Sequence, residues 1–152
     1  IQKNFKNCSR IYIESPELAW FFCNALKLEI RLVWQYLFAD FVSLELPPNI
    51  LFHESYHLTR LLPRHGVSIP MYERGLLPFH HGWNVKDCGG EGHYRFVNPE
   101  DANQMALRFF EDAQGDGRKI DELVCQNLSC IEHLKGLGNA RVTYWLDYCF
   151  AA

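Results

Sequence analysis

The sequence predicts one helix-rich α+β domain over residues 1–152, and three observations lead to that fold class. The chain of 152 residues is long enough to enclose a single hydrophobic core, to which its 48% of apolar residues can contribute. Helix-start signals recur along it, separated by irregular stretches. Aromatic residues make up 14% of the chain, which is untypical of a disordered protein. No internal repeat or low-complexity segment divides the chain, so we expect one domain.

The first predicted helix begins at Ser15-Pro16-Glu17. Serine is a good N-cap, and proline suits the first helical position because no backbone N–H is needed there. We expect the buried side of this helix to carry Leu18, Phe21, Phe22, Ala25 and Leu26. The apolar stretch 28–46 is either one long helix or a helix followed by a strand at 41–44, since its periodicity fits both.

A second helix is expected from Asn49 to about Leu62. Two prolines precede it, Asn49 is a suitable N-cap, and Pro63 would stop it because proline cannot continue a helix. A long loop over residues 66–92 follows, rich in glycine, proline and histidine. Loops of this length inside a small domain are often functional, so we expect part of a site there.

The C-terminal third contains further helix signals. Asn98-Pro99-Glu100-Asp101 opens a helix that Gly115-Asp116-Gly117 ends. Its apolar face is expected to carry Met105, Ala106, Phe109 and Phe110. We expect another helix over residues 120–134, then a turn at 136–138. The last segment, 141–150, fits a helix or a strand.

The segment His53-Glu54-Ser55-Tyr56-His57 carries the most specific chemical signal in the sequence. On the expected helix, His53 and His57 would lie on one face, where both imidazoles could bind one Zn²⁺ ion. Glu54 would lie beside the metal, take a proton from a zinc-bound water and pass it to the leaving amine. The alternative is an ordinary amphipathic helix with two histidines on its polar face.

A zinc peptidase site needs a third protein ligand, and the sequence leaves three candidates open. His81 is preferred, because the His80-His81 pair stands next to the flexible Gly82 and neutral imidazole is a good zinc ligand. His80 is the second candidate and Glu73 the third. The alternative for the histidine pair is a surface loop with solvated side chains.

Six cysteines occur without a C-x-x-C pair: Cys8, Cys23, Cys88, Cys125, Cys130 and Cys149. Their even number favours three disulfides, and hence a disulfide-stabilised, secreted protein. Two N-glycosylation patterns, Asn7-Cys8-Ser9 and Asn127-Leu128-Ser129, favour the same compartment and predict a glycoprotein. One alternative is six reduced cysteines in a cytosolic protein. Another is a second zinc site built from Cys88, His93, Cys125, Cys130 and His133.

The motif and its surroundings resemble secreted fungal zinc peptidases of the deuterolysin (aspzincin) type. The resemblance covers His53-Glu54-Ser55-Tyr56-His57, Gly82-Trp83 with Cys88, and residues 98–102 leading to Phe109-Phe110. It implies a small zincin-like domain with an HExxH active-site helix. His53 and His57 would then be ligands and Glu54 the catalytic residue. That family uses a loop aspartate as third ligand, whereas this chain has Pro78-Phe79-His80-His81-Gly82 there.

We therefore expect a secreted, zinc-dependent endopeptidase that acts on a peptide or protein substrate, with Glu54 as general acid/base. One alternative is a secreted zinc-binding or host-interaction (effector-like) protein without catalysis. A less favoured alternative is a helix-turn-helix regulator over residues 58–74, with three arginines meeting DNA phosphates. The net charge of −3 and the lack of a basic run argue against nucleic acid as a partner. No apolar run reaches the length of a bilayer span, so we expect no membrane partner.

Overall fold

The computed structural model describes residues 10–33, 49–62, 87–115, 117 and 119–150. Within this part of the chain, helices and parallel strands form a single small α+β domain, so the predicted fold class is confirmed at this level. None of the helices described there is both long and apolar enough to span a bilayer.

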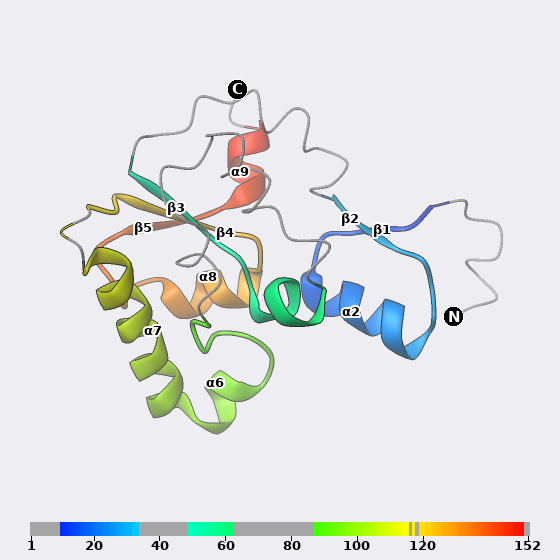
Figure 1. Ribbon diagram of the computed structural model, residues 1–152, viewed down its shortest axis with the longest axis horizontal. Coiled ribbons are helices and arrows are strands. Elements are labelled where there is room, and N and C mark those ends of the chain that lie inside the picture. Colours follow the sequence, from blue (N-terminus) through cyan, green and yellow to red (C-terminus); the bar gives the residue numbers. More distant parts are fainter. Residues whose placement is uncertain (1–9, 34–48, 63–86, 116, 118, 151–152) are drawn as a thin grey trace.

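The central sheet has three parallel strands in the order β3-β4-β5 (Figure 1). These strands are β3 (Ile50–His53), β4 (Glu122–Cys125) and β5 (Arg141–Tyr144). The register places His53 opposite Cys125, and Cys125 opposite Tyr144. The carboxyl ends of all three strands therefore meet at one edge of the sheet.

Both faces of the sheet are covered. Successive strand side chains point to opposite faces, so Leu51 and Leu123 pack into one core while Phe52 and Val124 pack into the other. The first core includes side chains of α7 (Pro99–Gln114) and α8 (Leu128–Leu134), and the second includes Ala19 of α2 (Pro16–Ala25) and Trp145 of α9 (Trp145–Phe150). Strands buried on both faces consist of continuous apolar runs, as Ile50-Leu51-Phe52 does.

Helix α2 (Pro16–Ala25) begins where the sequence predicts, and the Ser15 side chain caps it by accepting from the Leu18 amide. The predicted buried face is wrong in part, because Leu18 and Phe21 are exposed while Pro16 and Ala19 are buried. The helix is flanked by a small parallel pair of strands, β1 (Tyr12–Ile13) and β2 (Arg31–Leu32). The predicted stretch 28–46 does not begin as a helix, because Arg31–Leu32 form β2, and its residues 34–46 lie outside the described part of the chain.

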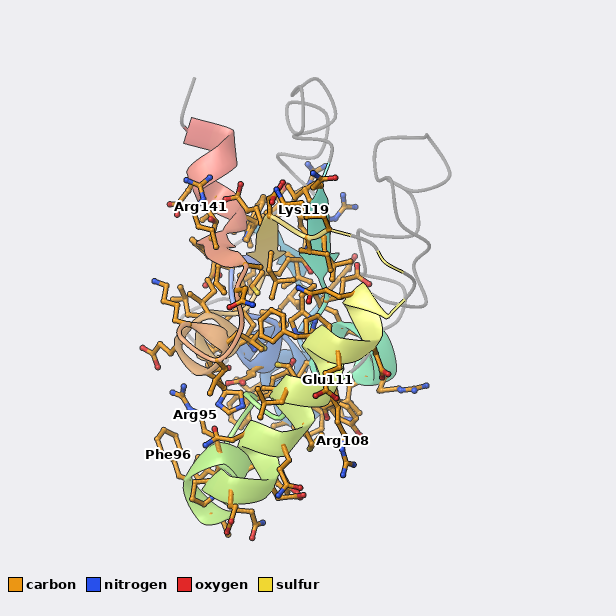
Figure 2. All side chains as sticks on the ribbon, turned by 90° about the vertical axis from the view of Figure 1, so that its left-hand side faces the viewer. Arg95, Phe96, Arg108, Glu111, Lys119 and Arg141 are labelled. Carbon is orange, nitrogen blue, oxygen red and sulfur yellow. The ribbon has the colours of Figure 1, made fainter. Side chains whose placement is uncertain are left out.

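Helix α7 follows the short helix α6 (Tyr94–Val97), and its start at Pro99 and its end before Gly115 confirm the prediction. Its buried residues are Ala102, Ala106, Phe109, Phe110 and Ala113. Figure 2 shows Arg108 and Glu111 pointing away from the sheet on the opposite, exposed face of this helix. This amphipathic division lets α7 cover one face of the sheet.

The predicted helix over residues 49–62, which would be the HExxH active-site helix of a zincin-like fold, is not formed. Residues Ile50–His53 are strand β3, and a five-residue π-helix, His57–Leu61, follows after a short break. A short apolar run fits a buried strand as well as a buried helix, and pairing with β4 decides between them here.

The predicted helix over residues 120–134 is also wrong in its first part. Residues Glu122–Cys125 form β4, and only Leu128–Leu134 form a helix, α8, whose N-cap is Asn127. The last segment takes both of its predicted forms, first as β5 and then as α9 (Trp145–Phe150). The remaining prediction, the helix-turn-helix over 58–74, lies mostly outside the described residues.

Candidate metal site

Polar side chains gather at the carboxyl edge of the sheet. His53 is the last residue of β3 and Cys125 the last of β4, and the chain continues from them into His57 and Asn127. In sheets of parallel strands, ligands bind at this edge because loops, rather than strands, surround it. The edge is therefore the place in the fold where a site is expected.

The loop Cys88–Gly92 packs closely against two helices at this edge. Gly89 has a φ of +74°, and a Cβ there would lie 2.9 Å from the Ala102 Cα of α7. A Cβ at Gly90 would lie 3.1 Å from the Cys130 Cα of α8. Only glycine permits these approaches. As a result, the residues on either side, Cys88 and Glu91, are brought to the end of β3.

His53, Cys88 and Cys130 form a buried group, and one ligand atom from each lies within 4.8 Å of the others. All three residues are at most 1% exposed. Neither ring nitrogen of His53 forms a hydrogen bond of regular geometry, although the Cys88 thiol lies close enough to influence its pKa. The ring packs edge-on against Phe109 with the centroids 4.9 Å apart. An imidazole and two thiols at this separation are suitable ligands for a soft or borderline metal ion.

Electrostatics within this group favour an ionised thiol. A hydrogen bond from Cys130 lowers the pKa of Cys88 far below its usual value, and the nearby His53 lowers it further. The same hydrogen bond, together with burial, raises the pKa of Cys130. Burial is the largest single effect on the pKa of His53 and lowers it, but the charge of Cys88, a hydrogen bond with that thiol and the charges of Glu91 and Asp87 together raise the pKa above its ordinary value. Thiolate is the form of cysteine that binds metal.

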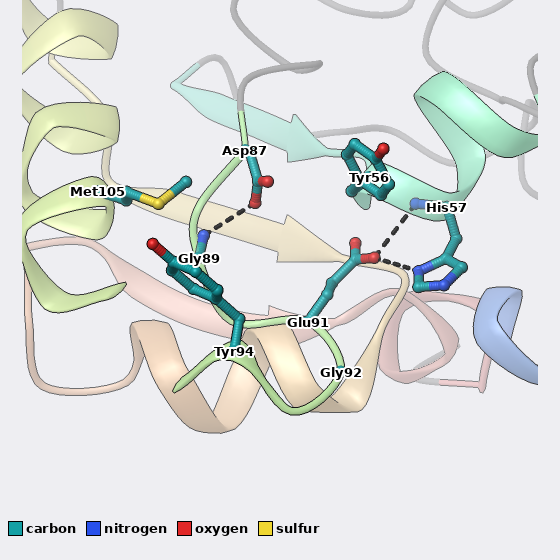
Figure 3. A pocket seen from close by; sticks show the side chains of 8 residues that line it. All are labelled: Tyr56, His57, Asp87, Gly89, Glu91, Gly92, Tyr94 and Met105. Carbon is teal, nitrogen blue, oxygen red and sulfur yellow. Dashed lines mark hydrogen bonds and ion pairs between the residues drawn. The ribbon is translucent and has the colours of Figure 1, made fainter. Parts of the chain in front are cut away.

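A second group, formed by Glu17, His57 and Glu91, adjoins the first. The Glu91 Oε2 atom accepts from the backbone amide of His57 at 3.1 Å and forms an ion pair with its ring Nδ1 (Figure 3). The other oxygen, Oε1, lies 3.7 Å from the Cys130 Sγ atom, whose single proton is shared between this oxygen and the Cys88 sulfur. Glu91 therefore connects the two groups.

The position of Glu17 in the second group is explained by its hydrogen bonds. Its Oε1 atom accepts from the Gly92 amide at 3.0 Å, from Asn127 Nδ2 at 3.3 Å and from Ser129 Oγ at 3.2 Å. Through these hydrogen bonds, the Oε1 atom links the first turn of α2 to the loop at residues 88–92 and to the start of α8. The second group is thus accounted for by hydrogen bonds and an ion pair.

A pocket of about 300 Å³ opens beside the two groups (Figure 3). Glu91 and His57 stand on one side of it, and Met105 and Asp87 on the other. Asp87 also accepts from the Gly89 amide at 2.9 Å, which fixes the loop that carries Cys88. The complete lining is Tyr56, His57, Asp87, Gly89, Glu91, Gly92, Tyr94 and Met105.

The residues predicted to form the site are only partly brought together. His53 and His57 fall into different groups, because the strand ends at the first and the π-helix begins at the second. Glu54 is buried and is absent from the pocket lining. The three candidates for the third ligand, His81, His80 and Glu73, lie outside the described residues.

Two residues of the buried group come from a weaker prediction, the zinc site of cysteines and histidines. Cys88 and Cys130 of that set meet in the buried group. His93 is exposed, and His133 is not part of the group, because its Nε2 atom donates to the Ala102 carbonyl at 3.1 Å. The signal missed in the sequence was the alternation of side chains in β3, which turns His53 toward α8 rather than toward His57.

The cysteines do not form the predicted three disulfides. Four of the six are free thiols: Cys23, Cys88, Cys125 and Cys130. At one of the two predicted glycosylation sites, the acceptor Asn127 is buried and its Nδ2 atom donates to Glu17. The other acceptor, Asn7, lies outside the described residues. Secretion stays a prediction.

Comparison with known proteins gives no further guide, since no family model, no curated protein sequence and no solved structure matches this chain.

Proposed function

We propose that this protein binds zinc through His53, Cys88 and Cys130. The observation that carries the proposal is the imidazole of His53, which is 1% exposed and lies within 4.8 Å of two buried sulfurs, while its contact with the Cys88 thiol does not reach the geometry of a regular hydrogen bond. Leaving a buried polar group unpaired costs about 1–3 kcal/mol. A metal ion held between this ring and the two adjacent thiols would remove that cost.

The donor set selects the metal. Two cysteine sulfurs and one imidazole nitrogen suit Zn²⁺, whereas Mg²⁺ and Ca²⁺ require oxygen ligands. Thiols must lose their protons to bind, and the lowered pKa of Cys88, which a hydrogen bond from Cys130 causes, favours this. Phe109 shields the site from solvent on one side, which strengthens the interaction of thiolates with a cation.

Elemental analysis of the purified protein tests the proposal. We expect about one zinc per chain in the wild type at saturating zinc, and none in His53→Ala or in Cys88→Ser with Cys130→Ser. His93→Ala is the matched control, because it removes an exposed histidine that lies outside the group. Loss of zinc in His93→Ala as well as in His53→Ala would contradict the assignment of the site to His53. No zinc in the folded wild type would overturn the proposal.

Zinc-dependent peptide hydrolysis is the second candidate function, and the pocket beside the buried group is the observation that favours it. In this case the metal would be held by the cysteine–histidine group, and Glu54 would keep its predicted role as general acid/base. Secretion and a peptide or protein substrate belong to the same candidate.

Hydrolysis of fluorescently labelled casein at saturating zinc tests the second candidate. Activity in the wild type that Glu54→Gln abolishes, without loss of zinc, would support a peptidase. A zinc-loaded wild type without activity would leave zinc binding as the function, which corresponds to the predicted non-catalytic alternative.

A further inference from the structure

We propose that Glu91 is the fourth ligand of the metal and that His57 holds it in place; this inference rests on the proposed zinc site. Three protein ligands leave one position of a tetrahedral ion to be filled. Among the described residues, two side chains compete for it. Glu91 contacts Cys130 directly, and Cys125 is the register partner of His53 on the adjacent strand.

The distance between Glu91 and Cys130 fits two ligands of one ion. Zinc–sulfur and zinc–oxygen bonds of about 2.3 Å and 2.0 Å, at tetrahedral angles, place the two donor atoms about 3.5 Å apart. The Oε1 atom of Glu91 lies 3.7 Å from the Cys130 Sγ atom. The present S–H···O contact would be replaced by two bonds to the metal once the thiol loses its proton.

The Oε2 atom of Glu91 is fixed by contacts with His57, in the way that second-sphere hydrogen bonds orient a carboxylate bound to a metal. A monodentate carboxylate ligand leaves one oxygen free, and hydrogen bonds to that oxygen fix the orientation of the group. Here the Oε2 atom accepts from the His57 amide at 3.1 Å and pairs with the His57 ring. The second histidine of the motif is thus a positioning residue for a ligand, rather than a ligand.

Cys125 is the weaker candidate. Its side chain points to the same face as His53, because paired residues of parallel strands share a face. Neither Cys125 nor Glu91 belongs to the group of three whose donor atoms lie within 4.8 Å of one another, but of these two only Glu91 has a hydrogen bond with one of its sulfurs, at 3.7 Å.

The choice between Glu91 and Cys125 decides whether the metal can be reached. A site closed by Cys125 would be structural, since three thiolates and an imidazole leave no exchangeable position. Glu91 lines the pocket, so in a site that it completes only its carboxylate separates the metal from the pocket. Removal of this carboxylate would open the position to a small anion or a water molecule that enters the pocket.

Cobalt substitution gives the test, with Co²⁺ and azide as the probes. Thiolate-to-cobalt charge-transfer bands report the sulfur ligands, and the visible d–d bands report the fourth ligand. We expect Glu91→Ala to keep the charge-transfer bands, to change the d–d bands, and to weaken Co²⁺ binding at least tenfold. Azide should then change the d–d bands of Glu91→Ala but not those of the wild type. His57→Gln should weaken binding between about ten- and a hundredfold, with the thiolate bands intact.

Cys125→Ala is the matched control and should leave both sets of bands as in the wild type. Reduced charge-transfer intensity in Cys125→Ala, with Glu91→Ala unchanged, would overturn the inference and assign a closed site of three cysteines and one histidine. Glu91→Gln, which keeps the side-chain volume, repeats the test if Glu91→Ala does not fold. A wild type without thiolate bands would refute the zinc site itself, which is a different outcome from the failure of Glu91 alone.

Discussion

His53 and His57 stand four residues apart in the sequence, yet each belongs to a different side-chain group. His53 ends β3 and faces two buried cysteines, whereas His57 begins the π-helix and pairs with Glu91 at the pocket. An HExxH helix would place both rings on one face. The strand separates them, and the metal chemistry of this chain therefore depends on residues 88–91 and on Cys130 as much as on the motif.

Zinc should protect two thiols from alkylation. A metal-bound thiolate does not react as a free nucleophile, and ligand binding also suppresses the opening that exposes buried residues. We expect iodoacetamide to label Cys88 and Cys130 slowly in the zinc-loaded protein and much faster after chelation, as measured by mass spectrometry of their peptides. Cys23, a partly exposed free thiol, is the internal control and should react alike in both samples. Equal labelling of Cys88 with and without zinc would contradict the prediction.

Glu17→Ala should lower the free energy of unfolding. The substitution leaves the Gly92 amide, Asn127 Nδ2 and Ser129 Oγ without their shared acceptor. These groups are part-buried, so we expect a loss of about 1–3 kcal/mol in urea unfolding. Glu111→Ala, an exposed residue on the outer face of α7, should change the stability by less than about 0.5 kcal/mol. Equal effects of the two variants would show that Glu17 does not join α2 to the site.

The sequence predicts the helices of this fold better than its sheet. Ser15-Pro16 and Asn98-Pro99 specify helix starts locally, the first through a serine cap and proline and the second through proline without a side-chain cap, and both predicted starts are confirmed. The strands Ile50–His53 and Glu122–Cys125 are short apolar runs whose own periodicity also fits a helix. Their pairing across about 70 residues of chain, which local signals do not contain, determines that they are strands.

The same dependence on long-range contacts explains why the sequence identifies only part of the site. His53 is identified by its motif, but its partners Cys88 and Cys130 come from other parts of the chain. They meet because Gly89 and Gly90 allow the loop to approach α7 and α8 closely. Composition suggested disulfides for these cysteines, whereas in the structure they are free. Only the tertiary contacts distinguish a thiol beside an imidazole from half of a disulfide.

The His57–Glu91 pair should make the metal-free protein less stable as the pH rises. Burial lowers the pKa of His57, but the hydrogen bond and charge of Glu91, with the charges of Glu17 and Asp87, together outweigh this effect, so the folded-state pKa lies above the ordinary 6.5. The folded state then binds this proton more tightly than the unfolded chain does. The resulting stabilisation is complete below about pH 6.5 and is lost as the pH rises through the raised pKa.

Urea unfolding from about pH 5.5 to about pH 8.5, with a chelator present, measures this effect. The difference in unfolding free energy between the wild type and His57→Gln should shrink toward high pH. This difference removes the contribution of His53, whose pKa is also raised. A constant difference over the whole range would contradict the ion pair.

Gly90→Ala should weaken metal binding more than it weakens the fold. The added Cβ would lie 2.9 Å from the His133 Cβ and 3.1 Å from the Cys130 Cα, both of which belong to α8. A helix packed against the sheet cannot yield by this amount, so the loop must shift and carry Cys88 and Glu91 away from His53. We expect Co²⁺ affinity to fall about tenfold or more, and overpacking to cost about 1–3 kcal/mol of stability.

Gly92→Ala in the same loop separates these two effects. A Cβ at Gly92 meets nothing within 4 Å, but the φ of +60° disfavours alanine by about 1–2 kcal/mol. This variant should therefore lose stability while its folded form binds Co²⁺ nearly as tightly as the wild type does. If both glycine variants bound Co²⁺ equally well, the close approach of the loop to Cys130 would not be what assembles the site. If only Gly90→Ala lost affinity, the position of the loop against α8 would be established as the determinant of metal binding.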